Sequence, residues 1–266
     1  MTDLPDDGAG SGDRETPEQD RSDLDGLQTS LTDLAGLVSG AMGLEGLLGQ
    51  VASFAAHAIP GADGAGVTLL RVEGPVTRVE ALATSHPFVA EIDEIQYVTL
   101  DEGPCLTAAR ERRTVRSGSL GGAKLWPRFG PRVGRLGVNS ALALPLLLPG
   151  HTVGAINVYA RAKDVFDDRA VAIGELFAAP AAVAVHNAGV LAQAVALTTQ
   201  LQAALASRPV IDQAIGVMRG RTGCTSAEAF TRLREISQRE HTKLVDVAHQ
   251  LVDEAVGRAR ARRTET

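Results

Sequence analysis

The sequence lacks most of the residues that mark a metalloprotein or a disulfide-stabilised protein. Its 266 residues include only two cysteines, Cys105 and Cys224, whose separation gives neither a metal-ligand spacing nor a disulfide framework. The six histidines are scattered along the chain. Aromatic residues make up only 3% of the chain, a bias typical of a high-GC coding sequence that carries no functional information. We therefore expect no metal and no cofactor.

Catalytic and membrane-spanning motifs are also missing. The glycine-rich residues 61–66 precede an expected strand instead of opening a helix, so they do not form a phosphate-binding loop. The sequence has no Walker-type lysine, no GxSxG and no paired acids beside histidines, so we expect no enzymatic activity. No signal-peptide-like run opens the chain, and the apolar residues 178–185 are too few to cross a membrane. These absences predict a cytoplasmic protein.

The length and the charge distribution predict more than one domain. A chain of 266 residues with 44% apolar content favours two domains with real cores. The net charge of −6 is uneven, because residues 1–34 carry ten acids and two bases, whereas residues 196–266 carry eleven bases and eight acids. A basic C-terminal module fits a polyanionic partner at that end, although an excess of three positive charges is weak evidence alone.

The N-terminal two thirds of the chain predicts an α+β domain, an antiparallel sheet flanked by helices. Residues 1–24 are acidic and poor in apolar residues, so we expect a disordered leader. Two helices are expected between residues 27 and 59, and hairpins at residues 65–83 and 140–159. A helix from about residue 167 to residue 206 follows, with a kink or break at Pro180.

Residues 207–256 predict three short amphipathic helices. Thr225 and Glu228 have the spacing of a capping box, and the helix after them should bury Ala229, Phe230 and Leu233. Arg234 has no acidic neighbour one turn away, which suits a phosphate or a base edge as well as an ordinary exposed arginine. Gly216 lies inside an expected helix, where close helix packing is favoured over close approach of a ligand.

This stretch resembles the ANTAR domain, the RNA-binding output module of bacterial transcription antiterminators. The resemblance is carried by Ser207-Arg208, Ile211 to Ala214, Gly216 to Met218, Ala229-Phe230, Leu233-Arg234, Ser237, Lys243-Leu244 and Val247-Ala248. It implies a dimer that stabilises tandem stem-loops in a transcript leader. With Phe230 in the core, we expect polar and arginine contacts to RNA, from Arg208, Gln213, Arg219, Arg221, Arg234, Ser237 and Lys243. Many ANTAR sequences carry lysine where this chain has Ile215, which either removes an RNA contact or deepens the helical core.

The preceding part resembles a GAF domain. The resemblance is carried by residues 101–105 (DEGPC), Trp126 to Phe129, the strand with Pro145-Leu146, residues 154–159 (GAINVY) and Phe166. It implies that a small ligand can lie between the sheet and the 85–130 connection, lined by Tyr97, Cys105, Trp126, Phe129, Asn157 and Tyr159. Core packing is the alternative role for the apolar members of this set. Cys105 near a helix start would have a lowered thiol pKa, or would be buried and inert.

The expected organisation is therefore a disordered leader (1–24), a GAF sensor (25–190), a connecting coiled-coil helix (191–206), an all-α three-helix ANTAR domain (207–257) and a basic tail (258–266). The long helix carries a partial apolar seam that suits a two-chain coil, formed by Val183, Val190, Val195 or Leu197, Leu201 and Leu205. The expected function is antitermination by RNA binding under control of a small ligand or a redox signal. The alternative is a ligand-sensing dimerisation or protein-interaction module that binds no RNA.

Overall fold

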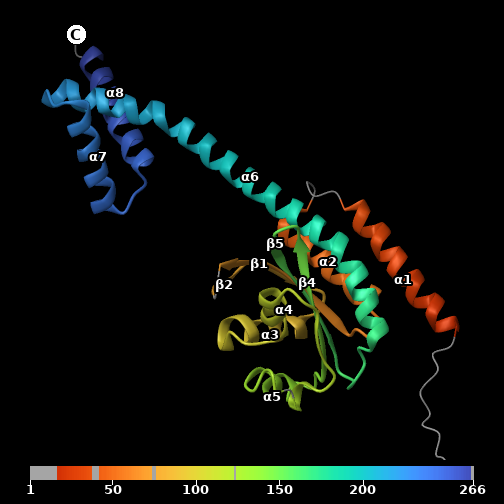
Figure 1. Ribbon diagram of the computed structural model, residues 1–266. Helices are drawn as coiled ribbons and strands as arrows, with labels where there is room; N and C mark the ends of the chain where they lie inside the picture. The colour runs from red at the N-terminus through yellow and green to blue at the C-terminus, as the bar shows by residue number, and fades with distance from the viewer. Residues whose placement is uncertain (1–16, 38–41, 74–75, 123, 265–266) are drawn as a thin grey trace, which may run out of the picture. The chain divides into compact units, whose positions relative to one another are not determined.

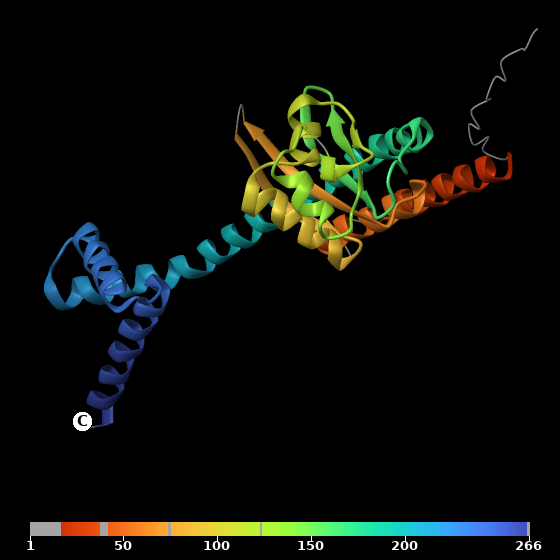
Figure 2. The same cartoon turned by 90° about the horizontal axis from the view of Figure 1, so that it is seen from below.

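The computed structural model describes residues 17–37, 42–73, 76–122 and 124–264, and it divides the chain into two compact units, Met1–Ala192 and Gln193–Thr266. Figures 1 and 2 show the elements. The first unit contains α1 (Pro17–Gly36), α2 (Gly43–Ala58), β1 (Gly64–Glu73), β2 (Val76–Thr84), α3 (Pro87–Glu94), a π-helix (Ile95–Leu100), α4 (Pro104–Glu111), β3 (Val115–Ser117), a 3-10 turn (Leu120–Gly122), α5 (Phe129–Gly134), β4 (Ser140–Leu148) and β5 (His151–Ala160). The long helix α6 (Asp168–Thr222) begins in the first unit, and α7 (Ser226–Glu240) and α8 (Leu244–Thr264) follow in the second.

The five strands form one antiparallel sheet in the order β2-β1-β5-β4-β3. The hairpins β1–β2 and β4–β5 are those that the sequence predicts, and β5 lies in the middle of the sheet. There β5 pairs with β1 through Val67 opposite Ile156, and with β4 through Leu144 opposite Ile156. A Cβ at Gly154 would overlap the backbone carbonyl oxygen of Thr68, so this glycine permits the close approach of β1 and β5.

The two faces of the sheet carry different helices and different cores. Successive side chains of a strand point to opposite faces, so β5 sends Ile156 and Val158 to one face and Asn157 and Tyr159 to the other. The first face packs on α2 and the N-terminal part of α6, with α1 lying on α2. The second face is covered by α3, the π-helix, α4 and α5, as Figure 1 shows. Asn157 and Tyr159 of β5 therefore lie beneath the α3–α5 layer.

Helix α1 extends further toward the N-terminus than the sequence predicts. It begins at Pro17, so residues 17–24 are helical, whereas residues 1–16 lie outside the described part. Buried Leu27 and Leu34 hold α1 on the rest of its unit. The Arg169 guanidinium contacts the carboxylates of Asp20 and Asp23 at the start of this helix, the latter at 3.1 Å. These ion pairs give the acidic residues a partner that hydropathy alone does not reveal.

Helix α6 is one unbroken element of 55 residues, so of the kink or break predicted at Pro180 the break is absent. Pro180 is exposed, while buried Phe177 and Ala181 on neighbouring turns hold the helix on the sheet. The first expected ANTAR helix is consequently the C-terminal part of α6. Among the described residues, α6 is also the helix long and apolar enough to cross a membrane, but its N-terminal part packs on the sheet, as a core helix does.

The second unit is built around a small apolar core. Val210 and Ala214 from α6, Leu233 from α7, and Val247 and Ala248 from α8 form its buried centre. Figure 2 shows α7 and α8 beside the last turns of α6. The predicted capping box is present, because the Glu228 N–H donates to Thr225 Oγ1 and the Thr225 N–H donates to Glu228 Oε2 at 2.8 Å. Residues 258–264, expected in a basic tail, continue α8 as helix.

Candidate sensor site and nucleic-acid interface

A buried polar network lies on the second face of the GAF-like sheet. The Tyr97 hydroxyl on the π-helix lies 3.0 Å from Thr68 Oγ1 of β1 and 2.6 Å from Cys105 Sγ of α4. Asn157 Nδ2 of β5 donates to the same hydroxyl and to Asp93 Oδ1 of α3, both at 3.4 Å. Five separate elements of the domain therefore meet through polar side chains at one place.

Four buried side-chain atoms of this region have no hydrogen-bond partner in the described part of the chain. They are Asp93 Oδ2, Gln96 Nε2, Asn157 Oδ1 and Tyr159 OH. Buried polar groups are normally paired, because leaving one unpaired costs on the order of 1–3 kcal/mol. The set contains both donors and acceptors, so a small molecule with donors and acceptors of its own could pair several of them.

Burial dominates the ionisation of this network. Desolvation raises the pKa of Asp93 from 3.8 to about 7, and the hydrogen bond from Asn157 opposes only part of the rise. Desolvation likewise raises the pKa of the Cys105 thiol to about 12, although the Tyr97 hydrogen bond lowers it. Of the two states expected for Cys105, the structure therefore supports the buried, inert thiol and not the lowered pKa. A fully buried thiol in this state is inert as a nucleophile.

The other predicted pocket residues are placed close by but serve the core. Trp126, Phe129 and Tyr159 are buried in one apolar cluster, and the Trp126 and Phe129 rings meet edge to face with centroids 6.4 Å apart. Trp126 Nε1 donates to Thr107 Oγ1 at 3.0 Å. The structure thus brings Tyr97, Cys105 and Asn157 into the polar network and places Tyr159 next to it.

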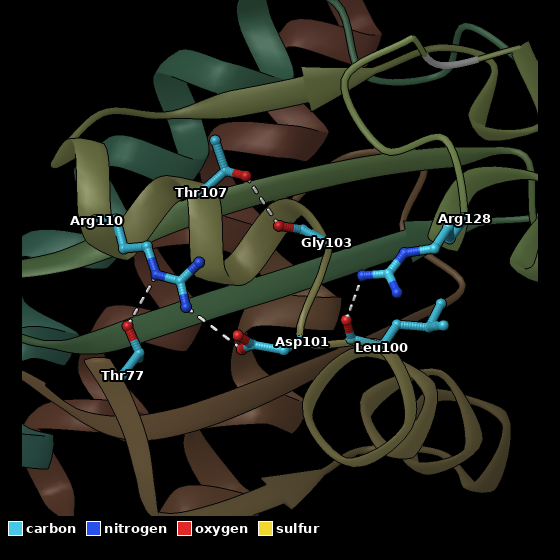
Figure 3. Close-up of polar contacts among 7 residues, drawn as sticks. All are labelled: Thr77, Leu100, Asp101, Gly103, Thr107, Arg110 and Arg128. Atoms are coloured by element: carbon cyan, nitrogen blue, oxygen red, sulfur yellow. Dashed lines mark hydrogen bonds and ion pairs between the residues drawn. The ribbon is translucent and has the colours of Figure 1, made fainter. Parts of the chain in front are cut away.

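A short segment with unusual backbone geometry covers this network. We call residues 95–103, the π-helix and the turn after it, the strap; it carries Gln96 and Tyr97 and turns at Asp101, which has a positive φ of 48°. Figure 3 shows two arginines that hold its end. Arg110 Nη2 donates to Asp101 Oδ1 at 3.3 Å, and Arg128 Nη2 donates to the Leu100 carbonyl at 2.8 Å.

Glu102 adds a third attachment of the strap. Its Oε1 accepts the backbone N–H groups of Arg128 and Phe129 at 2.8 and 2.9 Å, and its Oε2 accepts from Arg128 Nε at 3.1 Å. Partial burial opposes ionisation, but these hydrogen bonds hold the pKa of Glu102 below its usual value of 4.5. The carboxylate therefore fixes the strap to the start of α5 at neutral pH.

The predicted RNA-contacting residues lie on the second unit, and most of them face solvent. Exposed members are Arg208, Gln213, Arg219 and Arg221 on α6, Arg234 on α7 and Lys243 just before α8. None of the five basic side chains forms an ion pair within the described residues, whereas Arg239 pairs with Glu240 and Arg258 with Glu254. Ser237 differs, because its hydroxyl is partly buried and donates to the Thr242 carbonyl at 2.6 Å.

The structure corrects the expectations for Phe230 and Gly216 and favours one of the two alternatives for Ile215. Phe230, expected in the core, is 41% exposed, since Ala229 and Leu233 already occupy the inner face of α7. Gly216 has nothing within 4 Å of an added Cβ, so helix packing does not explain this glycine. Ile215 packs against the apolar core, which favours the core role for this departure from the family pattern.

Comparison with protein families decides the identity of both parts. The GAF domain model matches residues 41–186, more than half of the chain, and the ANTAR domain model matches residues 199–252. The chain is a GAF–ANTAR protein. GAF domains are sensors and ANTAR domains are RNA-binding antitermination modules, so this architecture is that of a regulator.

The GAF–ANTAR protein is similar to solved GAF structures at low identity. The GAF domain of an Acinetobacter phosphoenolpyruvate-protein phosphotransferase is 16% identical, with a TM-score of 0.47, over 64% of this chain and 97% of that chain. The corresponding domain from Coxiella burnetii is 17% identical, with a TM-score of 0.46, over 67% and 98%. The type II free methionine-R-sulfoxide reductase of Thermoplasma acidophilum is 18% identical, with a TM-score of 0.42, over 54% and 93%. No curated protein matches the chain.

Sequence reasoning missed three residues of the sensor network, Thr68, Asp93 and Gln96. Thr68 is a polar residue in an otherwise apolar strand, which is a usable signal beside Asn157. Asp93 and Gln96 look like surface residues of a short helix, and only the packing of that helix on the sheet buries them. Within the described ranges no three His, Cys, Asp or Glu side chains gather as metal ligands.

The raised pKa of Asp93 predicts a pH-dependent stability. Below about pH 4 the carboxyl is protonated in both the folded and the unfolded state; between pH 4 and 7 only the unfolded state releases the proton, so stability falls. Asp93→Asn removes this titration and keeps the acceptor for Asn157. We expect the unfolding free energy of the variant, relative to wild type, to rise by on the order of 4 kcal/mol from pH 4 to 7. Urea unfolding across this range measures it, and a constant difference contradicts the assignment.

Proposed function

We propose that this GAF–ANTAR protein is a cytoplasmic, signal-responsive regulator that binds tandem stem-loops in transcript leaders and acts by antitermination. The observation that carries the proposal is the set of exposed basic side chains on the ANTAR unit that lack acidic partners among the described residues, Arg208, Arg219, Arg221, Arg234 and Lys243. Unpaired guanidinium groups suit phosphate oxygens and base edges.

Phe230 adds a stacking surface to this proposed interface. It lies four residues before Arg234 on α7, so both side chains occupy neighbouring positions on one side of the helix. Sequence-specific RNA recognition uses splayed loop bases that stack on aromatic rings or on guanidinium planes. A half-exposed phenylalanine beside a free arginine supplies both surfaces, and this replaces the expectation that arginine alone stacks.

The proposed signal is a small ligand that enters the network beneath the strap. The unpartnered Asp93 Oδ2, Asn157 Oδ1 and Gln96 Nε2 would pair with it, and the network contains no basic side chain. A buried anion without a basic partner is costly, so the ligand is neutral or cationic and carries N–H or O–H groups. The arginine and Glu102 attachments of the strap would have to open to admit it.

The proposed regulator is a homodimer joined along α6. Leu176, Val183, Val190 and Leu197 recur every seven residues and are 60%, 49%, 52% and 57% exposed, and Leu201 continues the stripe. Apolar residues at this period form the seam between two supercoiled helices. The helix that packs on this stripe is α6 of a second copy of the chain, because that copy carries an apolar stripe of the same period and length. Two copies would present two ANTAR units to two stem-loops.

The RNA interface is tested with two arginines of one helix. Arg234→Ala removes an unpaired guanidinium, whereas Arg239→Ala, the matched control, removes one that already pairs with Glu240. Wild type should retain leaders with paired stem-loops from a pool of native transcripts at 200 mM as well as 50 mM salt. Arg234→Ala should lower that retention at least about tenfold, a loss of roughly 1–3 kcal/mol, with no change in melting temperature.

Other outcomes of that experiment favour the competing function. If Arg239→Ala weakens retention as much as Arg234→Ala, general charge rather than Arg234 is responsible. Bulk RNA that is released at the higher salt indicates only electrostatic binding. Retention of no RNA by wild type would favour a ligand-sensing dimerisation module without RNA binding.

Phe230→Leu tests stacking separately from charge. Leucine keeps an apolar side chain of helix-forming type but cannot stack on a base, and the position is 41% exposed. Affinity for the retained leader should fall by about 1–3 kcal/mol, as expected for one lost base–aromatic stack. Fluorescence anisotropy with a labelled leader measures the fall, and Phe230→Tyr, which keeps the ring, should restore most of the affinity. Equal affinity of the leucine variant and wild type contradicts stacking.

The seam on α6 is tested by charge placed inside or beside it. Leu197→Glu puts a carboxylate in the seam, and Val195→Glu puts one at an equally exposed position two residues away and off the stripe. Analytical ultracentrifugation should give monomer for Leu197→Glu and dimer for Val195→Glu. Binding to tandem stem-loops should fall at least tenfold in the monomer because bivalent attachment is lost, while binding to one stem-loop is unchanged. A dimeric Leu197→Glu variant would rule out this seam.

A further inference from the structure

Two histidines that are distant in sequence lie next to each other in the first unit. His151 opens β5 at the β4–β5 hairpin, and His186 lies on α6, which packs on the same face of the sheet as α2. Their ring centroids are 5.3 Å apart, with an angle of 58° between the ring planes. His151 is exposed and His186 is partly exposed. Neither ring forms a hydrogen bond or an ion pair within the described ranges.

The spacing of the rings fits a shared metal ion. Two imidazoles that bind one tetrahedral ion through metal–nitrogen bonds of about 2.0–2.1 Å have ring centroids about 5 Å apart. Neutral imidazole is a common ligand of zinc, copper and nickel. Simple ring packing would bring little energy here, because the open His151 ring removes little apolar surface from water.

We propose that His151 and His186 bind one divalent transition-metal ion of the zinc and copper class. No other His, Cys, Asp or Glu of the described residues joins them in a group of three. Water therefore completes the coordination, and the ion exchanges freely instead of forming a permanent structural site. The site lies at the hairpin and is built from none of the residues of the polar network under the strap.

Such an ion joins the hairpin to α6. The contact between these elements otherwise depends on apolar packing, of Ala178, Ala182 and Val185 against the sheet. A metal that binds the folded unit and not the separated elements stabilises that packing by mass action. The occupied site therefore holds the N-terminal portion of α6 on the sheet of the first unit.

The test uses the full-length, tag-free protein, stripped of metal with a chelator and titrated with zinc chloride by calorimetry. Wild type should bind one ion per chain and melt at a higher temperature when zinc is present. His151→Gln and His186→Gln should each lower the zinc affinity at least tenfold, since loss of a ligand costs no less than loss of an outer-shell partner, which is 10–100-fold. His241→Gln, in the second unit, is the matched control and should bind zinc as wild type does.

One further variant separates metal binding from ring packing. His151→Phe keeps an aromatic ring against His186 but supplies no ligand nitrogen, so its metal-free melting temperature should equal that of wild type while zinc binding is lost. Cobalt(II), used as a spectroscopic probe, should give a visible absorption band with wild type that His151→Phe lacks. The proposal is overturned if wild type binds no zinc at 100-µM concentrations, or if either glutamine variant binds zinc as tightly as wild type.

Discussion

The GAF unit depends on a central strand that is buried on both faces and on both edges. β5 pairs with β1 and β4, so the side chains from Val153 to Ala160 point into the two cores. Alternation then decides the architecture: Ile156 and Val158 anchor α2 and α6, and Asn157 and Tyr159 meet the α3–α5 layer. A polar amide at such a position requires partners, and Asp93 and Tyr97 supply them from elements that would otherwise be surface helices.

That requirement also leaves unpaired polar atoms on this face of the sheet. The amide of Asn157 has its N–H groups paired and its carbonyl oxygen unpaired, beside an unpaired oxygen of Asp93. Burial raises the pKa of the Asp93 carboxyl to about 7, which favours its protonated form. Ion pairs and hydrogen bonds hold the exposed end of the strap over this site. Water competes with such polar contacts, so they are weaker than buried apolar packing.

Different residues of helix α6 belong to the GAF core, to the ANTAR core and to an exposed apolar stripe. Its inward residues, such as Phe177 and Val185, belong to the GAF core, and its last turns supply Val210 and Ala214 to the ANTAR core. The apolar stripe from Leu176 to Leu201 belongs to neither core. One helix therefore contributes residues to both cores and keeps an exposed apolar stripe besides. Its continuity through Pro180 follows from tertiary packing, which offsets a cost of about 3 kcal/mol for proline inside a helix.

The sequence by itself determined what depends on neighbours along the chain. The two hairpins, the capping box of Thr225 and Glu228, and the GAF and ANTAR motifs all follow from local patterns, because turn chemistry and helix capping act over three or four residues. Only the tertiary structure decided the burial of Cys105, the exposure of Phe230 and the burial of Asp93. Asp93 and Asn157 are 64 residues apart, and the cost of desolvation at each position depends on which helix covers it. A periodicity that marks Phe230 as apolar cannot show that Ala229 and Leu233 already fill the inner face of α7.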